Sequence, residues 1–389
     1  RARGARPAPA AADHSESAGQ RRREAAVEDP RGRHAVGLER QGPHERRGLH
    51  HPRDRRAVDR GRRRGARGLP PQLTVGRRRP HRAVVVEGIA EDETIEAILG
   101  LHRELQRRET EAIATPEEAR RANTELRLRM RELNNYLPDL ERLAEKQLRA
   151  AGHTQGALTH RTVSIMAEQL GFELIYADDL PPSTRSITDL ENGRIYLPPA
   201  SIPGGHGLRS MALQAMAHRL LGHQPPTSYA DFLQQRLEIN YYAACCLMPE
   251  ANAVAFLQQA RKDRNLAVED FRDAFGVTHE AAAMRMTNLM TEHLGMPLHF
   301  LRVGEAGQIE RVYENDALPL PEDVTGSVEG QIVCRKCAAR DAFDQQNRTT
   351  EHYQYTDTPA GTFWCSTQTG TAERGAFSIT VGVRFDDAK

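Results

Sequence analysis

Two neighbouring segments decide the fold: Met211-Ala-Leu-Gln-Ala-Met-Ala-His-Arg-Leu-Leu-Gly-His223 and Arg236-Leu-Glu-Ile-Asn-Tyr-Tyr-Ala-Ala-Cys-Cys-Leu-Met-Pro249. Apolar residues recur on one side of each segment, and the second ends in proline, so both are predicted to be helices. The first segment carries His218 and His223, and the second carries Glu238. Imidazole and carboxylate groups are common metal ligands, so the spacing of these residues decides what chemistry they can perform.

The spacing of the two histidines argues against a working zinc site. A zinc-binding helix presents two histidines four residues apart, about 40° apart around its axis. His218 and His223 are five residues apart, or about 140°, and cannot both face one metal ion unless the helix is distorted. Arg219 stands where such a motif has its glutamate base, and a guanidinium cannot accept a proton. We therefore expect no catalysis, with His218, His223 and Glu238 as degenerate zinc positions or a surface pair without a ligand role.

The two segments together resemble the core of the ImmA/IrrE metallopeptidase family. That family has H-E-x-x-H on one helix and an E-x-N-x-x-A-A-x-L-L-M-P-like run on the next. The matches in this chain are Glu238, Asn240, Ala243, Ala244, Leu247, Met248 and Pro249. The resemblance implies a mostly helical, peptidase-derived domain. The competing interpretation is an active zinc-dependent endopeptidase that cleaves a repressor.

Charge is unevenly distributed along the chain. Residues 1–83 hold 23 Arg and 9 Asp plus Glu, a net charge of +14, which leaves about −13 for the remainder. This segment has no Lys, Ile, Met or aromatic residue, so it cannot bury a core and is predicted to be disordered. It is interpreted as a basic arm that binds nucleic acid, an inert low-complexity tail, or a GC-rich coding region translated out of frame. The absence of lysine favours the frame artefact.

Other features limit the class of protein. No run of about 18 apolar residues occurs, so no membrane span and no membrane partner are expected. The five cysteines are unevenly spaced and do not form the framework of a secreted disulfide protein. A cytoplasmic location is expected.

The pattern along the chain predicts an α+β fold in four parts. Residues 1–83 are the disordered arginine-rich arm, and residues 84–152 are a helical linker region. Residues 153–298 form the ImmA/IrrE-like sensor domain, and residues 299–389 form a small antiparallel β-rich C-terminal domain. The abrupt end after the last predicted strand suggests a C-terminal truncation.

Local signals place several elements. Thr115-Pro116-Glu117-Glu118 supplies an N-cap, a proline and an acidic first turn for a helix to about Leu133. Asn192-Gly193 between two apolar runs predicts a hairpin. Thr278 caps a late helix. Alternating residues predict strands at 300–303, 309–313, 352–355, 362–364 and 377–383.

This order of parts resembles the actinobacterial short-chain fatty-acyl-CoA-responsive transcription regulators of the RamB/PrpR type. The points of resemblance are Asn135-Tyr136-Leu137, the run from Asn240 to Ala244, Arg285, Phe300-Leu-Arg-Val303 and Cys334. The resemblance implies a short-chain acyl-CoA effector, an XRE-type DNA-binding head and a homo-oligomer. Residues 1–83, where the family carries this head, contain no recognisable helix–turn–helix pattern.

Four residues are predicted to bind acyl-CoA: Arg285, Tyr241, Arg302 and Arg161. Coenzyme A carries phosphates that suit the planar arginine fork, and its pantetheine arm suits aromatic walls. Arg285 is expected to border the core and face a groove, one position beyond the inward-facing Met284. The alternative for each arginine is a surface charge or an internal ion pair.

Three cysteines form a possible metal site. Cys334 and Cys337 have the C-x-x-C spacing of metal ligands, and Cys365 lies in a predicted strand. The regulator resemblance implies an iron–sulfur cluster in this region, but a fourth ligand is missing from the sequence pattern. The alternative is three free thiols in a reduced cytoplasm.

Overall fold

The computed structural model describes residues 114–178, 180, 186–190, 192–199, 206–348, 350–372 and 375–388. These residues all belong to one compact unit. The arginine-rich segment and the start of the predicted linker lie outside the described residues. Among the described helices, none is long and apolar enough to cross a membrane.

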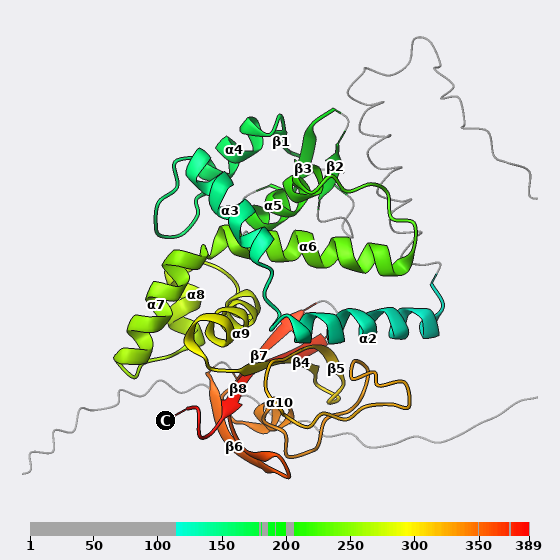
Figure 1. Cartoon of the computed structure of the whole chain (residues 1–389), viewed down its shortest axis with the longest axis vertical. Helices are drawn as coiled ribbons and strands as arrows, with labels where there is room; N and C mark the ends of the chain where they lie inside the picture. Colours follow the sequence, from blue (N-terminus) through cyan, green and yellow to red (C-terminus); the bar gives the residue numbers. More distant parts are fainter. Residues whose placement is uncertain are drawn as a thin grey trace, which may run out of the picture. The chain divides into compact units, whose positions relative to one another are not determined.

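Helices dominate the first two thirds of the described chain (Figure 1). They are α2 (Pro116–Glu132), α3 (Pro138–Ala150), α4 (His160–Gln169), α5 (His206–Leu220), α6 (Tyr229–Leu247), α7 (Glu250–Lys262), α8 (Val268–Phe275) and α9 (His279–Leu294). A small sheet of order β1-β3-β2 accompanies them. Its strands are β1 (Glu173–Tyr176), β2 (Ile187–Asp189) and β3 (Arg194–Leu197).

The last third forms a five-stranded antiparallel sheet of order β5-β4-β8-β7-β6. Its strands are β4 (Leu298–Gly304), β5 (Ile309–Glu314), β6 (His352–Thr358), β7 (Gly361–Ala372) and β8 (Gly375–Arg384). The short helices α10 (Ala338–Asp341) and η1 (Ala342–Asp344) lie between β5 and β6 in sequence. The predicted α+β class and the antiparallel strands are confirmed.

Helix ends follow the predicted capping signals. The Thr115 side chain accepts the backbone N–H of Glu118, whose carboxylate accepts the backbone N–H of Thr115 in return, a complete capping box. Asn134 and Asn135 then adopt left-handed backbone conformations, which end α2 before the proline that starts α3. The hydroxyl of Thr278 caps α9 by accepting the N–H of Ala281.

One hydrophobic core continues from the helices into the large sheet. Phe300, Ile379 and Val381 from the sheet belong to the same buried cluster as the apolar faces of α5, α6 and α9. Helix α9 packs on β4 and β8. The predicted domain boundary at residues 298/299 therefore falls inside a shared core.

Candidate functional site

His218, His223 and Glu238 are in contact. Nδ1 of His223 lies 3.0 Å from Nδ1 of His218, and its Nε2 lies 2.9 Å from Oε2 of Glu238. The predicted 140° separation of the histidines was wrong because α5 ends at Leu220. Gly222 then has a φ of +65°, and the N–H of His223 donates to the His218 carbonyl at 2.9 Å, which folds the second ring onto the first.

Glu238 is also held by groups other than the histidines. Both oxygens of Glu238 are engaged, because Oε1 accepts a hydrogen bond from the Gln234 amide at 2.5 Å. The Gln234 side chain in turn accepts from Arg129 at 2.5 Å. In the part of the chain that the structure describes, no three His, Cys, Asp or Glu side chains converge so as to hold a metal ion.

Arg219 has a structural role at the position of the expected base. Its guanidinium donates to the carbonyls of Leu170 at 2.8 Å and Gly171 at 3.1 Å, and also to that of Leu190. The same group lies 3.9 Å from the centre of the Phe172 ring. These contacts satisfy carbonyls at the carboxyl end of α4 and tie that helix to the small sheet.

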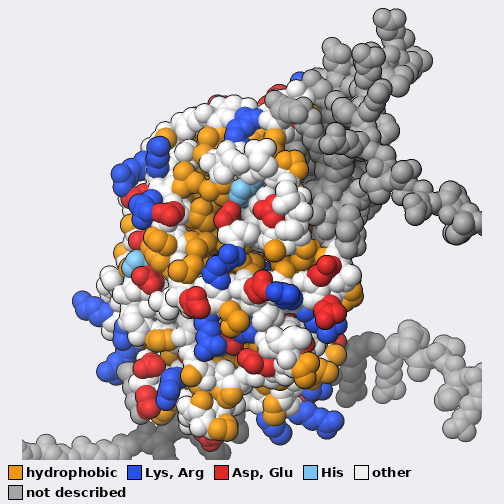
Figure 2. Space-filling model, turned by 45° about the vertical axis from the view of Figure 1, so that its right-hand side comes forward, with side chains coloured by type: hydrophobic (Ala, Val, Ile, Leu, Met, Phe, Trp, Pro, Cys, Tyr) orange, Lys and Arg blue, Asp and Glu red, His pale blue; other side chains and the backbone are white. Residues whose placement is uncertain are grey.

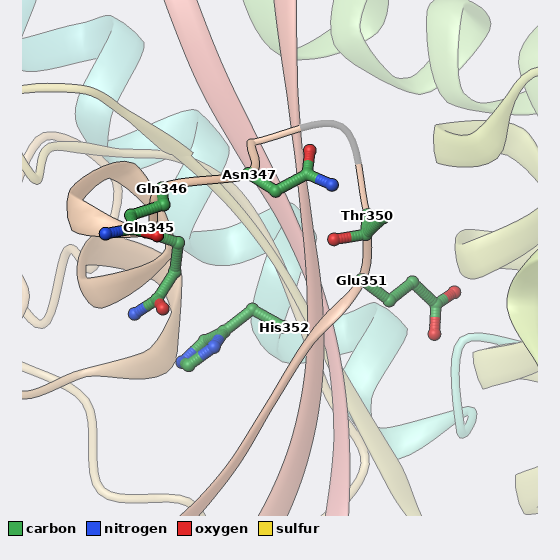
Figure 3. A pocket seen from close by; sticks show the side chains of 6 residues that line it. All are labelled: Gln345, Gln346, Asn347, Thr350, Glu351 and His352. Atoms are coloured by element: carbon green, nitrogen blue, oxygen red, sulfur yellow. The ribbon is translucent and has the colours of Figure 1, made fainter. Parts of the chain in front are cut away.

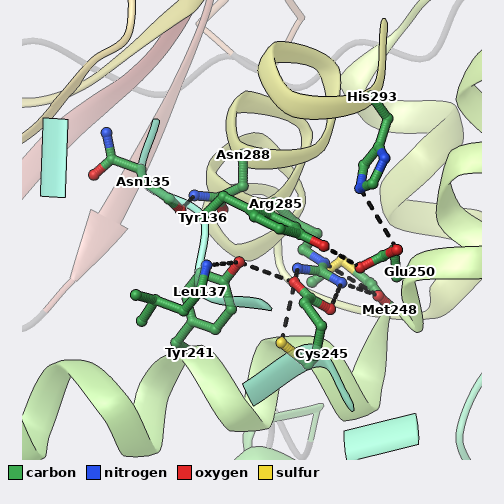
Figure 4. Close-up of polar contacts among 11 residues, drawn as sticks. Asn135, Tyr136, Leu137, Tyr241, Cys245, Met248, Glu250, Arg285, Asn288 and His293 are labelled. Atoms are coloured by element: carbon green, nitrogen blue, oxygen red, sulfur yellow. Dashed lines mark hydrogen bonds and ion pairs between the residues drawn. The ribbon is translucent and has the colours of Figure 1, made fainter. Parts of the chain in front are cut away.

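Arg285 lies in the core, so its expected position at a groove edge was wrong. It is 1% exposed and forms a two-pronged ion pair with Glu141 of α3, with Nη2 and Oε2 2.8 Å apart. Its Nε and Nη2 also donate to the Met248 carbonyl at 3.1 and 3.0 Å (Figure 4). A guanidinium held in this way has no exposed edge for a phosphate. The contact with Glu141 is an internal ion pair, the alternative given for each arginine.

Tyr241 completes this buried cluster. Its hydroxyl donates to Glu141 at 2.9 Å and accepts the N–H of Leu137 at 3.0 Å. Burial raises the pKa of Tyr241 and that of the adjacent Cys245. Burial also favours the protonated form of Glu141, but Arg285 and the hydrogen bonds outweigh it and hold the pKa of Glu141 below its usual value. The cluster thus joins α3, α6 and α9 through charged and hydrogen-bonded groups.

The two other predicted arginines lie elsewhere. Arg302 on β4 is partly exposed, pairs with Glu280 and with Glu310 at 2.7 Å, and lies 3.7 Å over the Phe377 ring. Arg161 is exposed on α4. Of the four residues predicted to bind acyl-CoA, the structure brings together the buried arginine and tyrosine.

The three cysteines differ in environment. Cys334 is exposed, Cys337 caps α10, and Cys365 is buried in β7. Burial, with smaller contributions from the other two thiols, raises the pKa of Cys337 to about 11. The described residues supply no three-ligand group here either. The iron–sulfur cluster stays a prediction.

A buried polar group on the large sheet was not predicted. Nδ1 of His299 lies 2.7 Å from Oδ2 of Asp316, and both side chains are fully buried. His299, Gly382 and Cys365 are aligned across three strands, and the missing side chain at Gly382 leaves room for His299 Nε2 and the Cys365 sulfur, 3.7 Å apart. Burial disfavours the charged ring, but Asp316 outweighs this and raises the pKa of His299 to about 10.

A shallow polar pocket lies before β6 (Figure 3). It is lined by Gln345, Gln346, Asn347, Thr350, Glu351 and His352. No Lys or Arg is among these residues, so the pocket lacks the charge that coenzyme A phosphates require.

Comparison with known proteins identifies relatives of the chain. No family model matches it. The chain is a distant homologue of the HTH-type transcriptional regulator PrpR of Mycobacterium tuberculosis, 23% identical over 248 residues, which cover 61% of this chain and 48% of the relative. It therefore spans about half the length of that protein. A solved Mycobacterium tuberculosis transcriptional regulator shares the fold, with a TM-score of 0.55 at 20% identity, covering 68% of this chain and 82% of the other.

Proposed function

We propose that the described residues form the effector-sensing part of a transcription regulator that has no peptidase activity. The observation that carries this proposal is Arg219, whose guanidinium binds backbone carbonyls at the position where a peptidase needs a proton acceptor. The distant homology to PrpR supports the regulator role. DNA contact would come from a head outside the described residues. On the face in Figure 2, basic and acidic side chains alternate without a continuous basic stripe.

The proposed effector is a short-chain acyl-CoA, as the family resemblance implies. Its binding would differ between two arrangements of the helices and so bias the affinity of the head for DNA. Among the predicted arginines, Arg302 suits this role better than the buried arginine, because it is partly exposed and already stacks on an aromatic ring. A phosphate would compete with Glu280 and Glu310 for its guanidinium.

The zinc content of the purified full chain separates this proposal from an endopeptidase. We expect no stoichiometric zinc and no cleavage of peptides or of a repressor. Glu238→Ala should leave the metal content unchanged, because the two carboxylate oxygens of Glu238 are engaged by His223 and Gln234. One equivalent of zinc that disappears in Glu238→Ala would favour the peptidase.

The effector is tested by calorimetric titration of the full chain with acetyl-CoA, propionyl-CoA and free coenzyme A. Arg302→Ala should weaken acyl-CoA binding about ten- to hundredfold, the effect of losing one charge-assisted contact of about 1.5–3 kcal/mol. Arg311→Ala is the matched control, because Arg311 is exposed and also pairs with Glu280, at 3.0 Å. If no acyl-CoA binds, the proposed effector is wrong. If Arg302→Ala and Arg311→Ala bind acyl-CoA with equal affinity, Arg302 is not a specific contact of the ligand.

A further inference from the structure

Strand β6 lies at the edge of the large sheet, and the direction of its backbone groups follows from its pairing with β7. Thr358 and Gly361 flank the two-residue turn, so the backbone groups of this pair face each other. The next pair is Asp357 with Thr362, and the Thr362 carbonyl accepts the N–H of Phe385 at 2.9 Å, away from β6. Asp357 therefore directs its own N–H and carbonyl outward.

The outward direction recurs at every second residue, at Tyr355 and Tyr353. Among the described residues, no backbone hydrogen bond reaches these three residues from the outer side. The strand contains no Lys, no Pro and no bulge, the devices that usually protect a free edge. A row of outward donors and acceptors therefore has no backbone partner in the part of the chain that the structure describes.

Exposed aromatic side chains accompany this edge. Tyr353 is 55% exposed and stacks on Trp364 with ring centres 5.6 Å apart. Tyr355 is 63% exposed and contacts Phe385 edge-on at 5.3 Å. Exposed aromatic residues are enriched at interfaces, because they bury a large area with few rotatable bonds.

We propose that β6 is a dimerisation strand that pairs antiparallel with β6 of a second copy of this chain, about a two-fold axis at Tyr355. In this register Tyr355 lies opposite Tyr355 of the second copy. Tyr353 of each copy lies opposite Asp357 of the other. The three outward-directed positions then form about six backbone hydrogen bonds. The two five-stranded sheets become one continuous sheet.

Charge selects this register. Moving the axis one residue toward the amino end of β6 places Glu351 opposite Asp357, which is repulsive. If the axis moves one residue toward the carboxyl end, Tyr353 lies opposite Pro359, which has no N–H. If the axis moves two residues in that direction, Asp357 lies opposite Asp357 of the other copy. With the axis at Tyr355 the two Asp357 carboxylates are about 13 Å apart along the strands, beyond the screening length of about 8 Å at physiological salt.

A two-fold dimer of this kind goes beyond the proposed function and does not depend on the effector. A closed isologous pair is the common form of homo-oligomer. It would also present two copies of a DNA-binding head to a palindromic site, which requires two-fold symmetry in the protein. This gives the expected homo-oligomer a specific interface.

Cysteine cross-linking of the full chain tests the register. Residues directly opposite in a hydrogen-bonded pair have Cα atoms about 5.5 Å apart, a distance that a disulfide spans. Under mild oxidation, Tyr355→Cys should form a covalent dimer through residue 355, identified by peptide mass spectrometry. Gln354→Cys is the matched control, since residue 354 faces 356 of the other copy and should not link to itself. A residue 354 link in place of the residue 355 link would overturn the register.

Sedimentation of the full chain tests the strand itself. Because the Tyr355 N–H points away from β7, Tyr355→Pro removes an intermolecular donor and leaves the β6–β7 ladder complete. We expect this variant to be monomeric at micromolar concentrations where the parent chain and Tyr355→Thr are dimeric. A monomeric parent chain would overturn the proposal, as would a dimer that survives in a folded Tyr355→Pro. If that variant fails to fold, the cross-linking result decides.

Discussion

At the scale of single residues, the polar groups that resist sequence interpretation are those paired across long distances in the chain. Arg285 meets Glu141, which lies 144 positions earlier, and His299 meets Asp316 on a loop after β5. An isolated arginine on an amphipathic helix favours a surface position, because nothing local identifies its buried partner. The planar guanidinium that suggested a phosphate contact binds the carboxylate of Glu141 inside the protein.

Removing one partner of the Arg285–Glu141 pair should lower the free energy of unfolding more than replacing both partners does. Arg285→Met leaves a buried carboxylate without its counter-ion and should lower the free energy of unfolding by about 3–5 kcal/mol. Adding Glu141→Leu should recover part of that loss, since both charges are then gone. Urea denaturation of the two single variants and the double variant measures this. Additive losses would show that the two residues do not act as a pair.

His299 should make stability fall on the alkaline side. Its pKa rises from an ordinary 6.5 to about 10 on folding, so the folded state holds the proton more tightly than the unfolded chain. The stabilisation is complete below about pH 6.5 and is lost as pH rises toward 10. Denaturant unfolding at several pH values should show that the free energy of unfolding falls between pH 6.5 and 10. The His299→Gln variant should be less stable, and its free energy of unfolding should change less over the same pH range. Equal slopes in both proteins would contradict it.

At the scale of elements, the sequence predicted the helix starts and turns whose signals are local, whereas the strand predicted at 362–364 extends over Gly361–Ala372. The capping box at Thr115, the turn at Asn192-Gly193 and the cap at Thr278 all lie where expected. The end of α5 was missed, although Gly222 carried the signal of a left-handed residue just past a helix. With that signal, the contact of His218 and His223 could have been anticipated.

The alignment of His299, Gly382 and Cys365 depends on strand pairing and was not predictable from one segment. A Cβ at Gly382 would lie 2.2 Å from His299 Nε2 and 2.9 Å from the Cys365 sulfur. Gly382→Ala should therefore cost about 1–3 kcal/mol of stability through overpacking. In a His299→Ala background the same change should cost clearly less. Denaturation of these four proteins provides the measurement, and an equal cost in both backgrounds would rule out the steric explanation.

At the scale of the whole molecule, a buried cation joins α2 to the large sheet. Arg127 is 8% exposed, pairs with Glu314 of β5 and donates to the Gly326 carbonyl at 2.7 Å. Because α2 is the first described helix, this contact ties the start of the described chain to the sheet. It is a contact through which a change in the sheet could reach α2.

Arg127→Met should loosen α2 selectively. Amides of α2 should exchange with solvent deuterium faster than in the parent chain, while those of β8 keep their protection. Arg121→Ala is the control, because Arg121 is largely exposed and pairs with Glu125 on the same helix, at 2.9 Å. Uniform acceleration in both elements would mean that the residue supports global stability rather than the attachment of α2.

The contacts of Arg219 also predict what a glutamate at this position would do to the fold. A single change to glutamate would place a carboxylate among the carbonyl oxygens of Leu170, Gly171 and Leu190, which repel it and lose their donor. Such a change should therefore destabilise the protein, because the carbonyls at the end of α4 lose their hydrogen-bond donor. A chain with glutamate at residue 219 would first need another hydrogen-bond donor at the end of α4.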